Sequence, residues 1–134
     1  WMTMTTFDDE LRKKIEPFTA SPSDRMKALM ELKKNWIKTY VFIWPILPYL
    51  TDWKLIIDVT KGFVDYYMFE NLNIKGSIWP SIKVFLQKHY PELVAEYEKI
   101  YFTKNDYWDK VEEDIVNFCG YYDINHAIYF HHGK

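Results

Sequence analysis

Cysteine is nearly absent from this chain of 134 residues, in which Cys119 is the single example. One thiol excludes an internal disulfide and excludes a metal site made of cysteines from this chain alone. Because a free cysteine behaves as a small hydrophobic residue, Cys119 is predicted to be buried on a helix. Chemistry that needs several thiolates therefore requires residues from outside this chain.

Long hydrophobic runs and export signals are missing as well. No apolar run reaches the roughly 18–20 residues needed to cross a bilayer, and no basic-then-apolar signal segment is present. These absences predict a cytoplasmic protein with no membrane partner. The chain opens Trp1-Met2-Thr3-Met4-Thr5, which alternates like a strand already in progress. We interpret this start as an internal point of a longer protein.

Charge of neither sign is in strong excess, since 17 basic and 19 acidic residues give a net charge of −2. This balance argues against nucleic-acid binding by bulk charge and leaves a local basic groove open. The sequence also has no glycine-rich phosphate loop, no His-Glu-x-x-His and no Ser/His/Asp signature. We interpret His131-His132 as a solvated end, and the isolated His89 and His126 as structural residues.

Hydrophobic residues are abundant at 49%, and aromatic residues at 19%, which suits one domain with a modest core. Three strands and three helices are predicted to alternate: strands near residues 1–6, 38–46 and 64–71, and helices near 8–15, 22–36 and 53–62. Asp8, Ser21 and Asp52 are the predicted N-caps. This order predicts an α/β fold in which adjacent parallel strands lie in one sheet, with the second and third helices on the same face.

The pattern changes to helices after Gly76. Three apolar stripes at helical spacing lie between Ile78 and Cys119, and residues 127–130 are expected to form a last strand. We therefore divide the chain into residues 1–75 and a helical extension, residues 76–134, packed on them. Three parallel strands are too few to close a barrel, so their outer edges stay unpaired and self-association is expected.

The carboxyl ends of the predicted strands carry the most suggestive chemistry. In open parallel sheets and barrels, ligands bind at that edge. At that edge lie Thr5 and Thr6, residues 44–50, and residues 70–73. They offer hydroxyl groups, an indole, a carboxylate, two amides and backbone carbonyls freed by prolines. From the residues alone, this mixture indicates a small-molecule or nucleotide site.

Three blocks of sequence resemble a known family. They are Thr-Thr-Phe-Asp-Asp-Glu-Leu-Arg-Lys-Lys-Ile-Glu-Pro (5–17), Ser-Pro-Ser-Asp-Arg (21–25) and Trp-Pro-Ile-Leu-Pro-Tyr-Leu-Thr-Asp (44–52). Together they resemble the C-terminal half of the radical S-adenosylmethionine (SAM) barrel in the spore photoproduct lyase-like, DNA-repair photolyase-like group. The similarity covers roughly residues 3–55, is weaker through Pro91-Glu92-Leu93, and is vague beyond. The resemblance implies a partial barrel of six βα units, of which residues 1–75 would supply the last three strands.

The resemblance also implies where the cofactor would lie. The small hydroxyl residue that contacts SAM at the end of the family's fourth strand falls on Thr5. The residue whose backbone faces the adenine, just before Pro-Ile on the fifth strand, falls on Trp44. Two departures stand out, because the family usually has a small residue in place of Trp44 and a glycine in place of Tyr49.

The family's Cys-x3-Cys-x2-Cys motif, which holds a 4Fe–4S cluster, would lie on a missing N-terminal half. The resemblance therefore implies a C-terminal fragment of a lyase-like radical SAM enzyme, inactive alone, that helps to position SAM and has the N-terminal half as its partner. A nucleic-acid substrate is implied by the family alone. The alternative is a non-enzymatic α/β interaction module that uses its exposed sheet edge or its tyrosine-rich helices. A cysteine triplet upstream would favour the enzyme.

Overall fold

In residues 1–132, which the computed structural model describes, the fold is α/β, with one small parallel sheet and six helices. The elements, in chain order, are β1 (Met2–Thr3), α1 (Asp9–Ile15), α2 (Pro22–Lys34), β2 (Tyr40–Ile46), α3 (Trp53–Thr60), β3 (Tyr66–Asn71), α4 (Ile78–His89), α5 (Leu93–Phe102), α6 (Tyr107–Tyr121) and β4 (His126–Tyr129). No helix in this part of the chain is long and apolar enough to cross a membrane.

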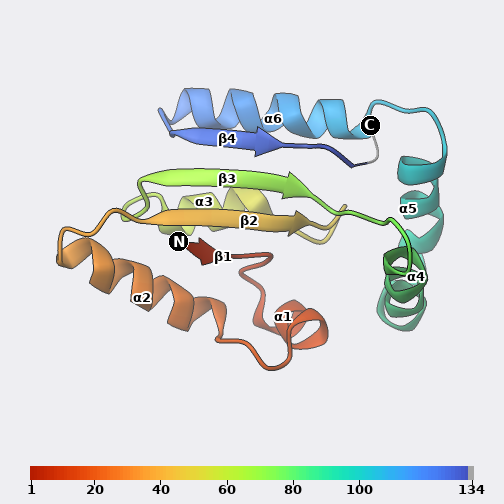
Figure 1. Cartoon of the computed structure of the whole chain (residues 1–134), viewed down its shortest axis with the longest axis horizontal. Coiled ribbons are helices and arrows are strands. Elements are labelled where there is room, and N and C mark those ends of the chain that lie inside the picture. Colours follow the sequence, from red (N-terminus) through yellow and green to blue (C-terminus); the bar gives the residue numbers. More distant parts are fainter. Residues whose placement is uncertain (133–134) are drawn as a thin grey trace.

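The strands lie in the order β1-β2-β3-β4, and every neighbouring pair is parallel (Figure 1). The predicted parallel pairing of the first three strands is therefore confirmed. The sheet has one strand more than the three predicted for it, because β4 returns after three helices and pairs with β3. The last strand was expected at residues 127–130, and it begins one residue earlier.

One face of the sheet carries the main hydrophobic core. Val41 and Ile43 of β2 and Tyr67 and Phe69 of β3 point to this face and are almost completely buried. They pack in one cluster with side chains from α2, α3 and α6, among them Leu29, Ile56, Ile57, Ile115 and Cys119. Helices α2 and α3 therefore share a face as predicted, and Cys119 is the buried helix residue that was expected.

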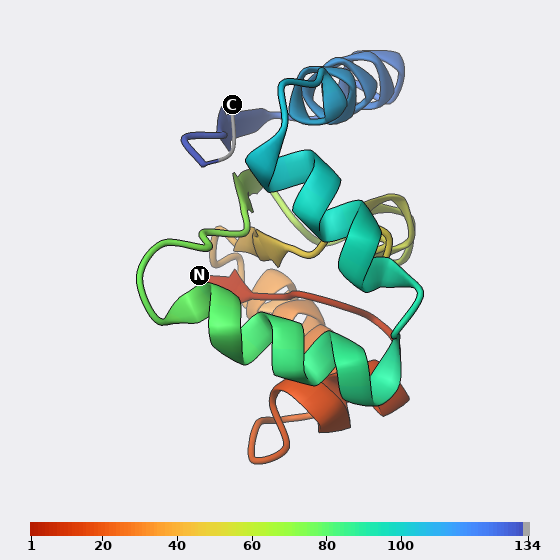
Figure 2. The same ribbon diagram turned by 90° about the vertical axis from the view of Figure 1, so that its right-hand side faces the viewer.

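The opposite face of the sheet has no helix packed on it among the described residues (Figure 2). Its side chains alternate with those of the core, and Tyr40, Phe42 and Trp44 point outward from β2. Trp1 stacks on Phe42 with a centroid distance of 6.3 Å, and Phe42 stacks on Trp44 at 6.0 Å. We call this surface the open face.

Side-chain caps explain where the first three helices begin. The Asp8 carboxylate accepts the backbone N–H groups of Glu10 and Leu11, and the Ser21 hydroxyl accepts that of Asp24. Asp52 does the same for Leu55 at the start of α3. All three caps are those predicted from the sequence.

The first strand is shorter than expected. Its ladder extends only to the Met4 N–H, which donates to the Phe42 carbonyl at 2.8 Å. Beyond that point the Thr5 hydroxyl bonds to β2, and the Thr6 hydroxyl accepts the Asp8 N–H. These side-chain hydrogen bonds compete with the ladder and turn the chain toward α1.

Candidate functional site at the carboxyl ends of the strands

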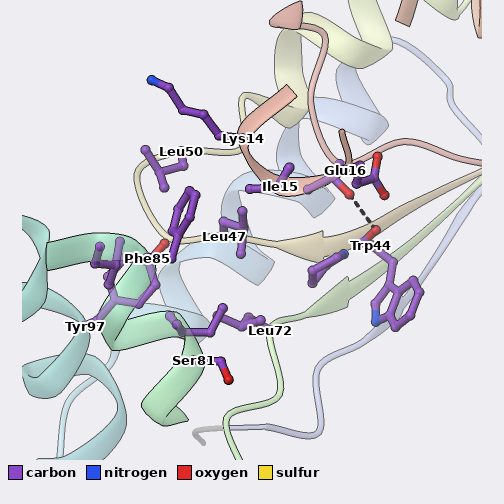
Figure 3. Close-up of a pocket in the computed structure, with 14 residues that line it drawn as sticks. Lys14, Ile15, Glu16, Trp44, Leu47, Leu50, Leu72, Ser81, Phe85 and Tyr97 are labelled. Carbon is purple, nitrogen blue, oxygen red and sulfur yellow. Dashed lines mark hydrogen bonds between the residues drawn. The ribbon is translucent and has the colours of Figure 1, made fainter. Parts of the chain in front are cut away.

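A pocket of about 390 Å³ lies at the carboxyl ends of β1, β2 and β3, between α1, the loop after β2, and α4 (Figure 3). Its lining residues are Thr5, Lys14, Ile15, Glu16, Trp44, Pro45, Leu47, Leu50, Leu72, Ser81, Ile82, Phe85, Leu86 and Tyr97. Pockets that hold small molecules have volumes of roughly 300–1,000 Å³. The pocket is therefore large enough for a small ligand, and it lies at the edge where the sequence predicted one.

The two residues predicted to face a cofactor are brought together at one end of this pocket. The Thr5 hydroxyl donates to the Trp44 backbone carbonyl at 2.9 Å, which links the ends of β1 and β2. Thr5 is only 2% exposed, and its hydroxyl oxygen can still accept a hydrogen bond. This end of the pocket therefore offers a ligand both a hydroxyl group and a backbone carbonyl group.

The indole of Trp44 takes a different direction from its backbone. In Figure 3 the ring points away from Leu47 and Phe85, and it stacks on Phe42 of the open face. The Trp44 side chain is 44% exposed. Trp44 thus contributes mainly its backbone to the apolar part of the pocket, and its ring belongs to the open face.

The floor of the pocket is apolar and firmly held. Leu47, Leu72, Leu86 and Tyr97 are buried and form a second hydrophobic cluster. The Tyr97 hydroxyl donates to the Pro48 carbonyl at 2.8 Å, which ties α5 to the loop after β2. Burial raises the pKa of Tyr97 far above its usual range, so this hydroxyl stays a donor at all physiological pH values.

The loop after β2 contains a strained residue, Tyr49, at a position where the resemblance predicts glycine. Tyr49 has a φ of 63°, in the left-handed region that favours glycine. Its ring packs near Tyr107 with a centroid distance of 5.6 Å, and its hydroxyl lies 3.4 Å from the Glu96 carboxylate. The backbone at this position therefore has the conformation for which glycine is suited, although the side chain is large.

Two charged residues at the pocket were not among the predicted site residues. The Glu16 carboxylate pairs with Arg25 at 3.1 Å, so its charge is compensated. Lys14 makes no salt bridge with any residue in the described part of the chain, and its ammonium group lies 3.4 Å from the Tyr90 hydroxyl. Both residues belong to the first block of the resemblance, but their positions, Lys14 in the last turn of α1 and Glu16 just after it, indicated only a helix end.

The end of β3 does not join this pocket through its polar residues. Glu70 lies 3.3 Å from the imidazole Nε2 of His132, and the Asn71 side-chain amide bonds to both backbone groups of His132. The expectation that His131-His132 is a solvated end is therefore wrong for His132, whose side chain is 18% exposed. Asn73 caps the next turn by accepting the Lys75 N–H. Only Leu72 of residues 70–73 lines the pocket.

Metal ligands are not gathered in the described part of the chain, where no three His, Cys, Asp or Glu residues lie close enough to hold an ion. Cys119 lies on α6 in the main core, away from the pocket lining. Burial raises its pKa to about 11, so it is a protonated thiol at neutral pH.

Comparisons with known proteins give relatives but no family. No family model matches the chain, and no solved structure matches it. An uncharacterized protein of Methanocaldococcus jannaschii is 45% identical over 91 residues, which cover 68% of this chain and 34% of that protein. Uncharacterized proteins of Mycobacterium bovis and Mycobacterium tuberculosis are 26% identical over 106 residues, covering 75% of this chain and 31% of theirs. The chain thus spans about a third of the length of these curated relatives.

Proposed function

We propose that this chain is the C-terminal half of the barrel of a radical SAM enzyme that resembles the spore photoproduct lyase-like DNA-repair lyases. In that protein the Thr5 and Trp44 end of the pocket would help to position SAM. The observation that carries the proposal is the 2.9 Å hydrogen bond from the Thr5 hydroxyl to the Trp44 carbonyl. It joins, at the ligand-binding edge of parallel strands, the two positions that the resemblance assigned to the cofactor.

The arrangement of the sheet supports the same proposal. Consecutive parallel strands with α2, α3 and α6 on one face are what an arc of a βα barrel requires. In a complete or partial barrel the other face is turned inward and covered by further strands. The open face, with its stacked Trp1, Phe42 and Trp44 rings, is the surface that a missing half would cover.

The residues present fit the nucleoside part of SAM and not the cluster. The Thr5 hydroxyl and the Trp44 backbone would hold the ribose and adenine, with apolar pocket walls beside them. With a 4Fe–4S cluster, SAM supplies a radical that abstracts hydrogen from a substrate. Three thiolates for that cluster would have to come from another part of the protein, since Cys119 is a buried core residue. The role of this half is then to orient the cofactor and to shield it from water.

The test is made on the chain joined to the upstream part of its polypeptide, with the chain alone as a second sample. The joined protein is expected to bind an iron–sulfur cluster and to release 5′-deoxyadenosine under reduction, and the chain alone to do neither. Thr5→Val should weaken SAM binding about two- to ten-fold, because the lost hydroxyl contact is worth roughly 0.5–1.5 kcal/mol.

Thr39→Val is the matched control. Thr39 is also buried, and its hydroxyl also donates to a backbone carbonyl, that of Phe63, at 2.6 Å. It precedes β2 and so lies at the opposite end of the strands. The two variants should lose similar stability, and only Thr5→Val should lose SAM affinity. Equal SAM binding by Thr5→Val and the parent would show that SAM does not bind at these strand ends. A joined protein that binds no cluster and cleaves no SAM would refute the proposed enzymatic activity.

The alternative, an α/β interaction module without enzymatic activity, is favoured by one observation. The open face presents a row of three stacked aromatic rings with no helix packed on them in the described part of the chain. Such apolar patches mark surfaces that bind other proteins. The cluster and cleavage assays decide between the two proposals, because an interaction module would show neither.

A further inference from the structure

We infer that the apolar end of the strand-end pocket binds an amphipathic carboxylate, with the hydrocarbon part of the ligand in the pocket and its carboxylate at Lys14. The inference goes beyond the proposed function, because such binding needs neither a cluster nor SAM. If the proposed function also holds, this ligand class describes the substrate side of the same pocket.

The shape of the pocket supports an apolar ligand body. Its floor is formed by the buried side chains of Leu47, Leu72 and Leu86, and half-buried side chains such as Ile15 and Phe85 form its walls. Figure 3 shows Ile15, Leu47, Leu72 and Phe85 turned toward a common space. Transfer of a hydrocarbon chain into such a space is favourable by about 0.8 kcal/mol for each buried CH₂ group.

The charges at the pocket decide which head group fits. Glu16 is neutralised by Arg25, whereas Lys14 has a hydroxyl and a ring of Tyr90 as its neighbours, the ring centroid being 5.1 Å from its Nζ. In Figure 3 the Lys14 side chain extends outward past Leu50, with its nitrogen outermost. A ligand whose hydrocarbon chain lies in the pocket can therefore place its anionic head group beside Lys14 while that head group stays hydrated.

The charge of Lys14 also acts on a neighbouring imidazole. His89, at the end of α4, has its pKa lowered by partial desolvation and then by the charges of Lys88 and Lys14. The imidazole lies next to the pocket wall, because its ring centroid is 5.1 Å from that of Phe85, so the charge of Lys14 is felt at this edge of the pocket. Charge complementarity selects an anionic head group over a neutral one, and a neutral one over a cation.

The experiment compares three probes with the same eight-carbon chain: octanoate, octanol and octyltrimethylammonium. Each is titrated into methyl-labelled protein at low salt and followed by NMR, the two ionic probes below their micelle-forming concentrations and octanol below its solubility limit. Shifts are expected at Ile15, Leu47, Leu72 and Ile82. Octanoate should bind about five-fold more tightly than octanol, and the cation more weakly than either. At about 1 M salt, where the Debye length is about 3 Å, octanoate and octanol should converge.

Charge reversal at two lysines isolates the head-group contact. Lys14→Glu should abolish the preference for octanoate, and Lys34→Glu, which makes the same change at an exposed site outside the pocket, should leave it intact. Leu50→Trp, which narrows the pocket, should weaken all three probes. Equal binding of octanoate and octanol by the parent, an equal effect of the two lysine variants, or shifts that spare the pocket methyls would each overturn the inference. None of these outcomes bears on cluster binding or SAM cleavage.

Discussion

Replacing Trp36 with glycine should stabilise this protein, although it removes the bulk of a tryptophan. Helix α2 ends with the Trp36 N–H donating to the Lys33 carbonyl and the Ile37 N–H to the Leu32 carbonyl, both at 3.1 Å. This is the hydrogen-bond pattern of a Schellman motif, in which the residue at the Trp36 position is usually glycine. Trp36 has a φ of 61°, and its side chain is 95% exposed.

The magnitude follows from two opposing effects. A residue with a Cβ in the left-handed region costs roughly 1–2 kcal/mol, and the exposed ring repays little of this cost by packing. Glycine removes that strain but increases the entropy of the unfolded chain, which offsets about 0.5–1 kcal/mol. The expected gain in the free energy of unfolding is therefore about 0.5–1 kcal/mol. For a chain of this length it corresponds to a rise in Tm of about 2–4 °C.

The assay is thermal and urea unfolding of Trp36→Gly, with Trp36→Ala as the matched control. Alanine also removes the exposed ring and keeps the strained φ, so its Tm should stay close to that of the parent. Tyr49→Gly gives a second comparison at a φ of 63°, where the contacts with Tyr107 and Glu96 offset the relief of strain, so little net change is expected. A glycine variant at position 36 no more stable than the alanine variant would refute the reasoning.

Two further predictions concern the thiol and the open face. Burial raises the pKa of Cys119 to about 11, so a thiol reagent such as Ellman's reagent should label it very slowly at pH 8 and rapidly in denaturant; fast labelling of the folded protein would contradict its place in the core. The chain alone should self-associate at micromolar concentrations through its open face, and Phe42→Lys, placed between the rings of Trp1 and Trp44, should shift light scattering toward the monomer; a monomeric parent would contradict this expectation.

Local signals predicted the first half of the fold well. Asp8, Ser21 and Asp52 mark helix starts because each supplies a side-chain acceptor just before an apolar repeat, and that requirement is local in the sequence. Because a helix separates each strand from the next, parallel pairing of adjacent strands was the simplest topology. The sequence did not indicate that β4 pairs with β3, because the pairing joins segments separated by three helices.

Apolar periodicity was less reliable where a helix ends. A helix was predicted near residues 22–36, but α2 ends at Lys34 and Trp36 points to solvent. Hydrophobic spacing cannot distinguish a buried tryptophan from an exposed one in the turn that follows. The pocket was only partly predictable for a similar reason. The first of the three apolar stripes predicted after Gly76 includes Ile82 and Phe85, but only the tertiary fold places these side chains over the strand ends.

The two departures from the pattern that the resemblance predicts affect side chains more than the backbone. Trp44 is large where a small residue is usual, yet its ring turns to the open face and its carbonyl accepts the Thr5 hydroxyl. Tyr49 is large where glycine is usual, yet its φ of 63° is one that glycine adopts easily. A site that uses backbone groups tolerates such replacements when the new side chain finds space elsewhere. At Trp44 that space is the open face. Its carbonyl links the ends of β1 and β2 through Thr5, and its ring adds to the aromatic surface that a partner would cover.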